Sequence, residues 1–533
     1  MNQVEVKRQQ IQGAAHILGL VTILIFSRMV GDNGIAYLGA AYEIFSFLLI
    51  LLGRNVPDAL GRMLRSRKAK GQYRNVSRVR RYVMVFQGMA GILGSLILAA
   101  GGTLLMKEAF GMPHGAVLML ILAPVFFLRM INSVLLGYFQ GEGTELPTAA
   151  TAVLRQVLFL GLGFLFLKLL KEYGEKVSAL LLQDDFVAMY ADMGILIALG
   201  VSELLVLVFL LVIYRGNGSN RKNVQEGMRT TDSFGRVVKI LYGNMFSATL
   251  IQLFMHLPIW IGLLFLHRSM ADKSLYVTQY GVYYGNYLIP CMVLLLIIDI
   301  LMAVASARVH AFLKKEEHKY ARIAFQGNLH GVVALGLYFS VFVTAMGGQL
   351  AAILSQQYAS SASRMLGCGA FVLFFAGVSD YFARLLWLEG KWHFLLAGLG
   401  GMNVLYVVSL ALFLNSGKLG VYSLVYAGLV GSALACVAFG LLLYRHIGIA
   451  VDWLRGLLIP AVCACLVGLL CLFFGKVFTP HLGSGVTLFI SLVVSFPVYW
   501  VLLLFFRTFR EQELKLIPGS GPVRVLGQML HLF

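Results

Sequence analysis

The stretch LLGYFQGEGTELPTAATAVLRQ (residues 135–156) joins two long apolar runs through a short polar hinge. The hinge consists of glycines, acids, threonine and a proline, which is typical of a tight turn between two helices. Each flanking run is about 20 residues long, the length that an α-helix needs to cross the ~30 Å hydrocarbon core of a membrane. Arg129 lies in the first run and Arg155 in the second. The stretch therefore predicts a hairpin of two membrane-spanning helices, with one arginine in each helix.

The composition of the whole chain indicates the same class of protein. The 533 residues are 59% hydrophobic and only 13% charged, roughly half the charged fraction of an ordinary soluble domain. Apolar runs of spanning length recur from end to end, so we expect an all-α polytopic membrane protein with about fourteen transmembrane helices. The expected spans cover about residues 11–31, 34–57, 82–106, 115–140, 148–170, 191–214, 237–266, 277–305, 323–346, 363–389, 393–414, 420–444, 456–475 and 486–506.

The basic residues of the chain are best explained by membrane topology. A net charge of +19 would suggest nucleic-acid binding in a soluble protein. Here most lysines and arginines fall in alternate loops, as the positive-inside rule describes. We therefore expect both termini in the cytoplasm, contacts with membrane lipids and no nucleic-acid partner. The six cysteines all fall inside expected spans without metal-ligand spacing, so we expect no metal site.

A long polar loop at 215–236 separates the first six expected spans from the next six. The fourth span ends in YFQGEG (138–143) and the tenth ends in WLEGKW (387–392), a short echo that indicates an internal repeat. We expect an N-terminal lobe at 1–214, a cytoplasmic inter-lobe loop at 215–236, a C-terminal lobe at 237–450, an extra helix pair at 451–506 and a cytoplasmic tail at 507–533.

The two arginines beside the hinge lie on polar helix faces. An ionised side chain at mid-bilayer costs at least about 2.5–3.5 kcal/mol on insertion scales, so it normally faces a partner or a cavity. Arg129 and Arg155 could cap carbonyls or pair with an acid such as Glu203 on the sixth span. They could instead form a cationic wall for an anionic ligand, since the guanidinium fork suits phosphate. Helical spacing places them beside Asn132, Ser133 and Gln140 in the first helix and Thr148 and Thr151 in the second.

Several acids also fall inside expected spans. For Glu43, in the second span, we expect neutralisation by an arginine. Asp380 and Arg384 are four residues apart on the tenth span, which favours a local ion pair. Asp299 and His256 have no evident local partner. As acids within expected spans, Glu43, Asp299 and Asp380 are the candidates for an ion-coupling site.

No sequence feature indicates an enzyme. The chain has no Walker A sequence, no paired catalytic carboxylates in a loop and no histidine cluster with ligand spacing. We expect no catalytic residue and no cofactor, with Na⁺ or H⁺ as the candidate coupling ion.

Three stretches resemble a known family. GYFQG…PTA in the opening stretch is similar to the signature of the flippases for polysaccharides and lipid-linked precursors. These belong to the multidrug/oligosaccharidyl-lipid/polysaccharide (MOP) exporter superfamily, and the resemblance is greatest to the stage V sporulation protein B-like branch. SRMVGDNGIAY (27–37) is similar to the junction between the first two spans, and NVPDALGRMLRSRKAKGQY (55–73) to the segment and basic loop that follow. The detailed resemblance covers roughly residues 15–160; beyond them it is mostly topological.

The resemblance implies a bacterial cytoplasmic-membrane protein of two six-helix lobes in a V-shaped (MATE/MOP-like) arrangement. A central cavity would open alternately to either face, and its arginines would hold the diphosphate of a lipid-linked sugar. Carried over by position, Arg28, Arg54 and Arg62 match cationic positions of the first two spans. Arg129 and Arg155 are added from their helical faces.

The second lobe departs from the family pattern. The seventh span reads GNMFSATLIQLFMHLPIW (243–260) where the branch usually begins with a proline and carries an acid further along. The eighth span lacks the usual proline near its inner end and reads MAVASARV (302–309). These departures bear on ion coupling and on the substrate rather than on the fold.

The leading interpretation is a flippase or exporter of an undecaprenyl-linked oligosaccharide or peptidoglycan precursor. It would act as a monomer, by alternating access, and bind the anionic headgroup in a cationic central cavity. A cation-coupled multidrug exporter on the same fold is the first alternative, and it predicts an acidic cavity around Glu43, Glu203 or Asp299. The second alternative is a non-transporting membrane scaffold of an envelope-synthesis complex, which would tolerate loss of the arginines.

Overall fold

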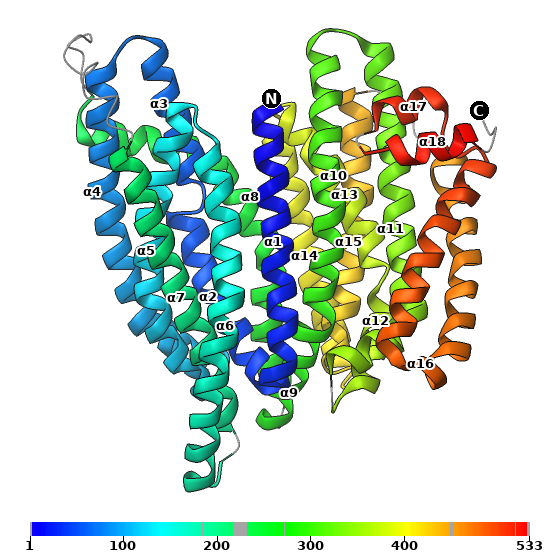
Figure 1. Ribbon diagram of the computed structural model, residues 1–533, viewed down its shortest axis with the longest axis horizontal. Helices are drawn as coiled ribbons and strands as arrows, with labels where there is room; N and C mark the ends of the chain where they lie inside the picture. The colour runs from blue at the N-terminus through cyan, green and yellow to red at the C-terminus, as the bar shows by residue number, and fades with distance from the viewer. Residues whose placement is uncertain are drawn as a thin grey trace. The chain divides into compact units, whose positions relative to one another are not determined.

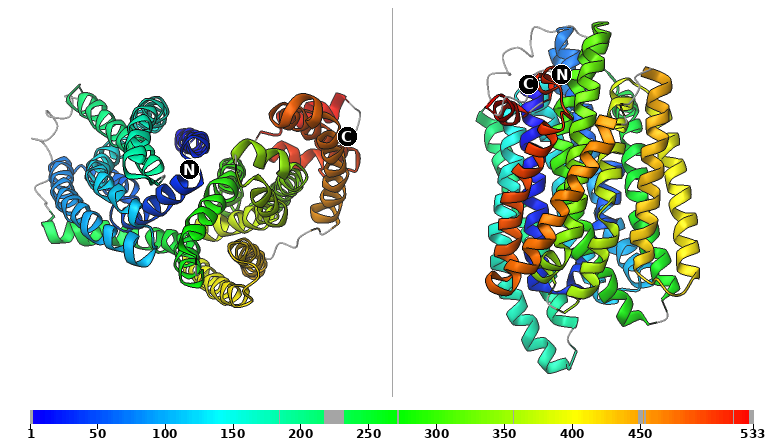
Figure 2. Two further views of the ribbon diagram at one scale, coloured as in Figure 1. Left: turned by 90° about the horizontal axis from the view of Figure 1, so that it is seen from below. Right: turned by 90° about the vertical axis from the view of Figure 1, so that its right-hand side faces the viewer.

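The computed structural model describes residues 3–529, apart from 184, 217–231, 271, 356, 448–451, 453 and 518. Helices and turns account for all the regular structure in these residues, so the expected all-α class is confirmed. The chain forms two compact units, an N-terminal unit (Asn2–Gly281) and a C-terminal unit (Val282–Phe533). Within each unit the helices run roughly parallel or antiparallel to one another (Figures 1 and 2).

The N-terminal unit begins with two long helices and a short amphipathic one. A π-helical stretch extends α4, and α6 and α7 form a hairpin that reaches beyond the other helices of this unit (Figure 1). The elements are α1 (Gln3–Val30), α2 (Asp32–Leu52), α3 (Val56–Ala69), α4 (Tyr73–Ile97), η1 (Leu98–Gly102), η2 (Leu105–Ala109), η3 (Pro113–Gly115), α5 (Ala116–Glu142), α6 (Leu146–Leu181), α7 (Asp185–Gly216), α8 (Phe234–Ser269) and α9 (Lys273–Tyr283), whose last two residues belong to the next unit.

The C-terminal unit is organised around α11, which packs against α10, α12, α13, α16 and α17. Its last long helix, α16, bends at Gly483, whose φ of 76° and ψ of 166° are not helical. Figure 1 shows the two arms of α16 as a hairpin. The elements are η5 (Tyr284–Leu288), α10 (Ile289–Lys314), α11 (His318–Leu354), α12 (Ala359–Gly369), α13 (Val372–Leu388), α14 (Trp392–Asn415), α15 (Tyr422–Ile447), η6 (Leu454–Leu458), α16 (Ile459–Phe505), α17 (Glu511–Leu516) and α18 (Gly521–Met529).

The number of membrane spans agrees with the sequence prediction once two bends are considered. In the described residues, 12 helices are long and apolar enough to cross a membrane, and the bent pair α12–α13 raises this to 13. One of the 12 is the 52-residue segment Leu454–Phe505, which contains both arms of α16. Its two arms correspond to the last two spans expected from the sequence.

The glycines of the opening stretch allow α5 to lie close against α3. A Cβ atom on Gly137 would lie 3.0 Å from the carbonyl oxygen of Pro57, and one on Gly141 would lie 2.6 Å from the Cβ of Leu64. Gly143 then ends α5 with a left-handed φ of 81°, a conformation that glycine adopts without steric cost. Pro147 falls in the first turn of α6, where its missing N–H is not needed. The motif is therefore structural: it packs α5 and ends it.

The hinge acids form ion pairs with the basic residues around them. Glu142 accepts a hydrogen bond of 2.8 Å from the ammonium of Lys68 on α3. Glu145, which is 8% exposed, lies 2.9 Å from the guanidinium of Arg8 on α1. These contacts fix the α5–α6 turn against the first and third helices. The hinge therefore stabilises the packing of the α5–α6 turn against α1 and α3.

Helix α8 packs within the N-terminal unit. Its residues Val237, Leu241 and Met245 share a buried cluster with apolar residues of α3, α4, α5 and α7. The inter-lobe loop expected at 215–236 falls largely on residues outside those that the structure describes. The expected lobe boundaries stay a prediction.

Replacement of Gly141 by alanine tests the close α3–α5 contact. The added Cβ would meet the Cβ of Leu64, so we expect a loss of about 1–3 kcal/mol of stability, the usual cost of overpacking. Gly161→Ala is the matched control, because no atom lies within 4 Å of its added Cβ and alanine favours a helix. Thermal unfolding of the two variants in detergent measures the difference. Equal midpoints for the two variants would contradict the packing role of the motif.

Candidate functional site

Arg129 of α5 and Arg155 of α6 meet at one buried carboxylate. The Nε atoms of the two arginines lie 2.5 and 2.6 Å from the same Oε1 atom of Glu203 on α7. The Glu203 side chain is 0% exposed. Asn132, one helical turn after Arg129, donates hydrogen bonds of 3.1 and 3.0 Å to the backbone oxygen and Oε2 of Glu203. The polar face predicted on α5 thus binds α7 through Glu203.

The shared carboxylate leaves this group of three ionised side chains with a net charge of +1. Two guanidinium groups carry two positive charges and Glu203 supplies one negative charge. The side chains of Arg129 and Arg155 keep 19% and 14% exposure, so neither is sealed inside the protein. The predicted ion pair with Glu203 is therefore formed, and it does not neutralise both arginines.

A third arginine and a histidine lie close to this group. Arg54 follows α2 and is exposed, and it lies within electrostatic reach of Arg129. His16 of α1 lies within reach of Arg54, Arg129 and Arg155. Arg54 forms no ion pair with any acid in the described part of the chain. We call Arg54, Arg129 and Arg155 the arginine cluster; it brings together three of the five predicted substrate-binding residues.

The other two predicted arginines lie elsewhere in the N-terminal unit. Arg28 is exposed in the last turn of α1, at the opposite end of that helix from Arg8. Arg62 lies on α3 and donates a hydrogen bond of 3.0 Å to the backbone oxygen of Asn244 on α8. The structure therefore separates these two residues from the arginine cluster, and their role in binding stays a prediction.

Among the described residues Glu43 on α2 forms no direct ion pair with an arginine, although Arg54 lies within electrostatic reach of it. It is 4% exposed, and its Oε2 atom accepts a hydrogen bond of 3.1 Å from the indole of Trp260 on α8. The Nδ1 atom of His256, one turn earlier on α8, lies 3.7 Å from the same oxygen. The physical reason is the position of α8, which packs beside α2 and supplies both partners.

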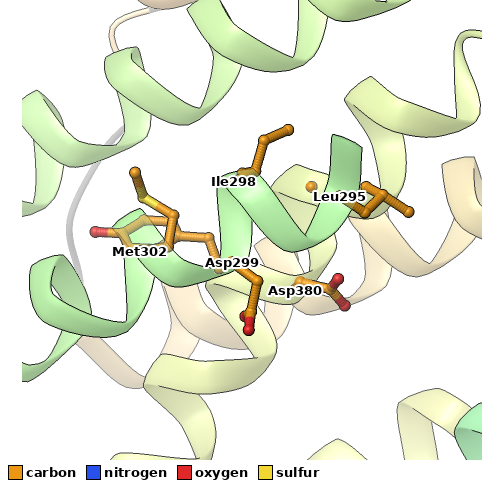
Figure 3. A pocket seen from close by; sticks show the side chains of 7 residues that line it. Leu295, Ile298, Asp299, Met302 and Asp380 are labelled. Carbon is orange, nitrogen blue, oxygen red and sulfur yellow. The ribbon is translucent and has the colours of Figure 1, made fainter. Parts of the chain in front are cut away.

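The acids of the C-terminal unit also form a different pair from the one expected. Arg384 of α13 contacts Asp299 of α10, whereas spacing favoured its neighbour Asp380. A long arginine side chain can reach across to a packed helix, and α10 packs against α13. Figure 3 shows Asp299 and Asp380 at one small pocket, which Leu295, Ile298 and Met302 also line. Two acids and one arginine thus meet at this pocket, and Arg384 contacts only one of the acids, Asp299.

A separate charged contact fixes the start of α8. Asp232 accepts hydrogen bonds of 2.9 and 2.7 Å from Arg67 of α3 and one of 3.0 Å from Asn75 of α4. Partial burial of the Asp232 carboxyl opposes its ionisation, but the hydrogen bonds from Asn75 and Arg67 outweigh this and lower its pKa. Asp232 is therefore ionised at neutral pH and anchors the start of α8 to α3 and α4.

Comparison with known proteins identifies the class. A family model for polysaccharide biosynthesis proteins matches residues 10–235. The chain is 21% identical over 521 residues to stage V sporulation protein B of Bacillus subtilis (strain 168), covering 95% of each chain. It is 24% identical over 166 residues to the lipid II flippase MurJ of the same organism, covering 29% of this chain and 30% of that protein.

Solved structures share the fold. An inward-facing multidrug resistance MATE family transporter of the MOP superfamily superposes with a TM-score of 0.65 at 15% identity, covering 84% of this chain and 98% of that one. The lipid II flippase MurJ in an inward closed conformation gives 0.64 at 11% identity, covering 92% and 97%.

The fold and these relatives define a multi-pass membrane protein with the fold of bacterial flippases and exporters. The chain is thus similar to the MOP exporter superfamily, and in particular to its polysaccharide-biosynthesis and stage V sporulation protein B-like branch.

Glu203→Gln tests the shared ion pair. The change leaves two cations beside a neutral amide, so we expect a loss of about 3–5 kcal/mol of stability, as when one partner of a buried ion pair is removed. Asp58→Asn is the control, because Asp58 forms an ion pair of 3.8 Å with its side chain 59% exposed, and exposed pairs contribute little. Thermal unfolding in detergent measures both. A loss no larger than that of the control would contradict the structural role of Glu203.

The lowered pKa of Asp232 gives a pH prediction. Its contribution to stability is present above the unfolded-state pKa of ~3.9 and is lost as the pH falls through the lower folded-state value. We therefore expect faster amide hydrogen exchange in the first turns of α8 in Asp232→Asn than in the wild type at neutral pH. The two proteins should converge only in strong acid. Equal exchange at neutral pH would contradict the anchor.

Proposed function

We propose that this protein moves a lipid-linked glycan precursor across the bacterial cytoplasmic membrane. The observation that carries the proposal is the arginine cluster, in which Arg129 and Arg155 share the single carboxylate of Glu203 and Arg54 lies within electrostatic reach of Arg129. Cations without full compensation are costly inside a membrane, and a phosphate ligand offers the compensation that Glu203 alone does not supply. Guanidinium groups bind phosphate oxygens through two parallel hydrogen bonds.

The substrate class follows from this chemistry and from the relatives. A diphosphate that links a sugar to an undecaprenyl chain is anionic and remains at the membrane. The fragment of this chain that is similar to the lipid II flippase supports a peptidoglycan precursor or a related oligosaccharide. Arg54, Arg129 and Arg155 would bind the diphosphate, and Arg28 and Arg62 would contact the headgroup at other stages of its passage.

We propose that both termini are cytoplasmic and that the protein acts as a monomer.

The membrane potential is the proposed energy source, because the substrate headgroup carries negative charge. A net negative headgroup that moves outward gains ~2.3 kcal/mol per charge per 100 mV of membrane potential. The pocket of Asp299 and Asp380 and the Glu43–His256 contact are candidate sites for a coupling Na⁺ or H⁺.

The pocket of Asp299 and Asp380 also favours the second candidate, a cation-coupled exporter of cationic drugs. That protein would bind its substrate at acids and would not need Arg54. The third interpretation, a membrane scaffold, requires neither the arginine cluster nor the pocket of Asp299 and Asp380.

Arg54→Ala is the cleanest test, because its loss leaves no acid unpaired among the described residues. We expect precursor movement in proteoliposomes to fall about 10- to 100-fold, which corresponds to the ~1.5–3 kcal/mol of a hydrogen bond to a charged group. Arg129→Lys and Arg155→Lys should lose activity as well, since lysine keeps the charge but not the fork. The control is Arg78→Ala on α4, an exposed arginine outside the cluster.

The outcome separates the three functions. Full precursor movement in Arg54→Ala, Arg129→Lys and Arg155→Lys would refute binding at the arginine cluster. Export of a cationic drug that fails in Asp299→Asn and survives in Arg54→Ala would establish the exporter. Absence of any transport by the wild-type protein would favour the scaffold.

A further inference from the structure

A buried acid of α7, Asp192, has no hydrogen-bond or ion-pair partner among the residues that the structure describes. The Asp192 side chain is 0% exposed. Neither of its carboxylate oxygens receives a hydrogen bond from any residue that the structure describes. No described lysine, arginine or histidine lies within ion-pair distance of it. This residue differs in kind from every site residue discussed above.

Glu203 on the same helix shows what a buried ionised carboxylate requires. It is equally inaccessible, and two arginines and an asparagine surround it. An ionised carboxylate without such partners costs tens of kcal/mol in an apolar medium, and the group instead takes up a proton. Asp192 therefore exists as the neutral carboxylic acid in this conformation.

The helices packed around Asp192 provide few charged groups. The facing start of α5, AVLMLILA (116–123), is apolar. On α6, Lys171 donates its hydrogen bond of 2.7 Å to the backbone oxygen of Met29. On α1, Arg28 is exposed. The titratable groups at this end of the unit also include Tyr37 of α2, His114 of η3, His267 of α8 and Asp185 of α7 itself.

Tyr37, Asp185 and His114 differ in how far their side chains reach the surface. Tyr37 is 3% exposed and lies within electrostatic reach of both Asp192 and Asp185. The His114 Nε2 atom lies 3.9 Å from Asp185, and their side chains are 31% and 41% exposed. Asn33 donates a hydrogen bond of 3.2 Å to Asp185. The exposed fraction thus rises from Asp192 to Tyr37 and is largest for Asp185 and His114.

We propose that Asp192 is a proton-binding site of the N-terminal unit, loaded from the α1–α2 end through Tyr37, Asp185 and His114. Its carboxylate takes up one proton from solvent to form the O–H bond of a carboxylic acid, and it returns that proton when the site opens. The ligand is a proton rather than a metal ion, because one carboxylate offers too few oxygens and the described residues contain no group of three metal-binding side chains. This site does not depend on the arginine cluster or on its substrate.

Infrared spectroscopy of the full-length protein in detergent tests the proposal. The carbonyl stretch of protonated carboxylic acids should be present at neutral pH and should lose intensity in Asp192→Asn, whose amide has nearly the same shape. Glu203→Gln is the matched control, because Glu203 is ionised and its replacement should leave that band unchanged. On transfer to D₂O the band should shift as the proton exchanges, and Tyr37→Phe should slow this shift several-fold.

Two results would overturn the proposal. If Asp192→Asn retains the wild-type band, or loses a carboxylate band instead, Asp192 does not hold a proton. If the band shifts in D₂O at the same rate in Tyr37→Phe, the path through Tyr37 is wrong. Asp192→Asn should also keep the wild-type unfolding temperature while Glu203→Gln lowers it. If Asp192→Asn lowers the unfolding temperature and Glu203→Gln does not, the charge states assigned to the two acids are wrong.

Discussion

The contact on which the N-terminal unit depends is the carboxylate of Glu203 between Arg129 and Arg155. It joins α5, α6 and α7 through a carboxylate that is 0% exposed, so loss of one partner would leave a buried charge unpaired. Because one acid serves two arginines, the contact stabilises the helices and still leaves positive charge. Structural stability and anion binding can therefore come from the same three residues.

The rest of the unit positions this contact. The glycines of GYFQG bring α5 against α3, and the paired acids of the hinge fix the turn between α5 and α6. Arg129 and Arg155, on either side of that turn, consequently face the same helix, α7. The C-terminal unit has its own intramembrane contact, between Arg384 and Asp299.

The sequence predicted the class, the spans and the arginines, because hydropathy and helical spacing are local properties. It could not choose a partner for Arg384, since a contact between α10 and α13 depends on packing. It also could not find Asp192. The sixth span was expected to begin at residue 191, where an acid would lie at the water interface. The helix actually begins at Asp185, which places Asp192 two turns inside the protein.

The central claim is that the arginine cluster binds a diphosphate headgroup, and direct binding tests it most simply. Titration of undecaprenyl diphosphate into the detergent-solubilised protein should give saturable binding that weakens about tenfold or more in Arg54→Ala and weakens as salt screens the charges. Undecaprenol, which lacks the phosphates, should not compete. Equal affinity of the wild type and Arg54→Ala, or full competition by undecaprenol, would contradict the account.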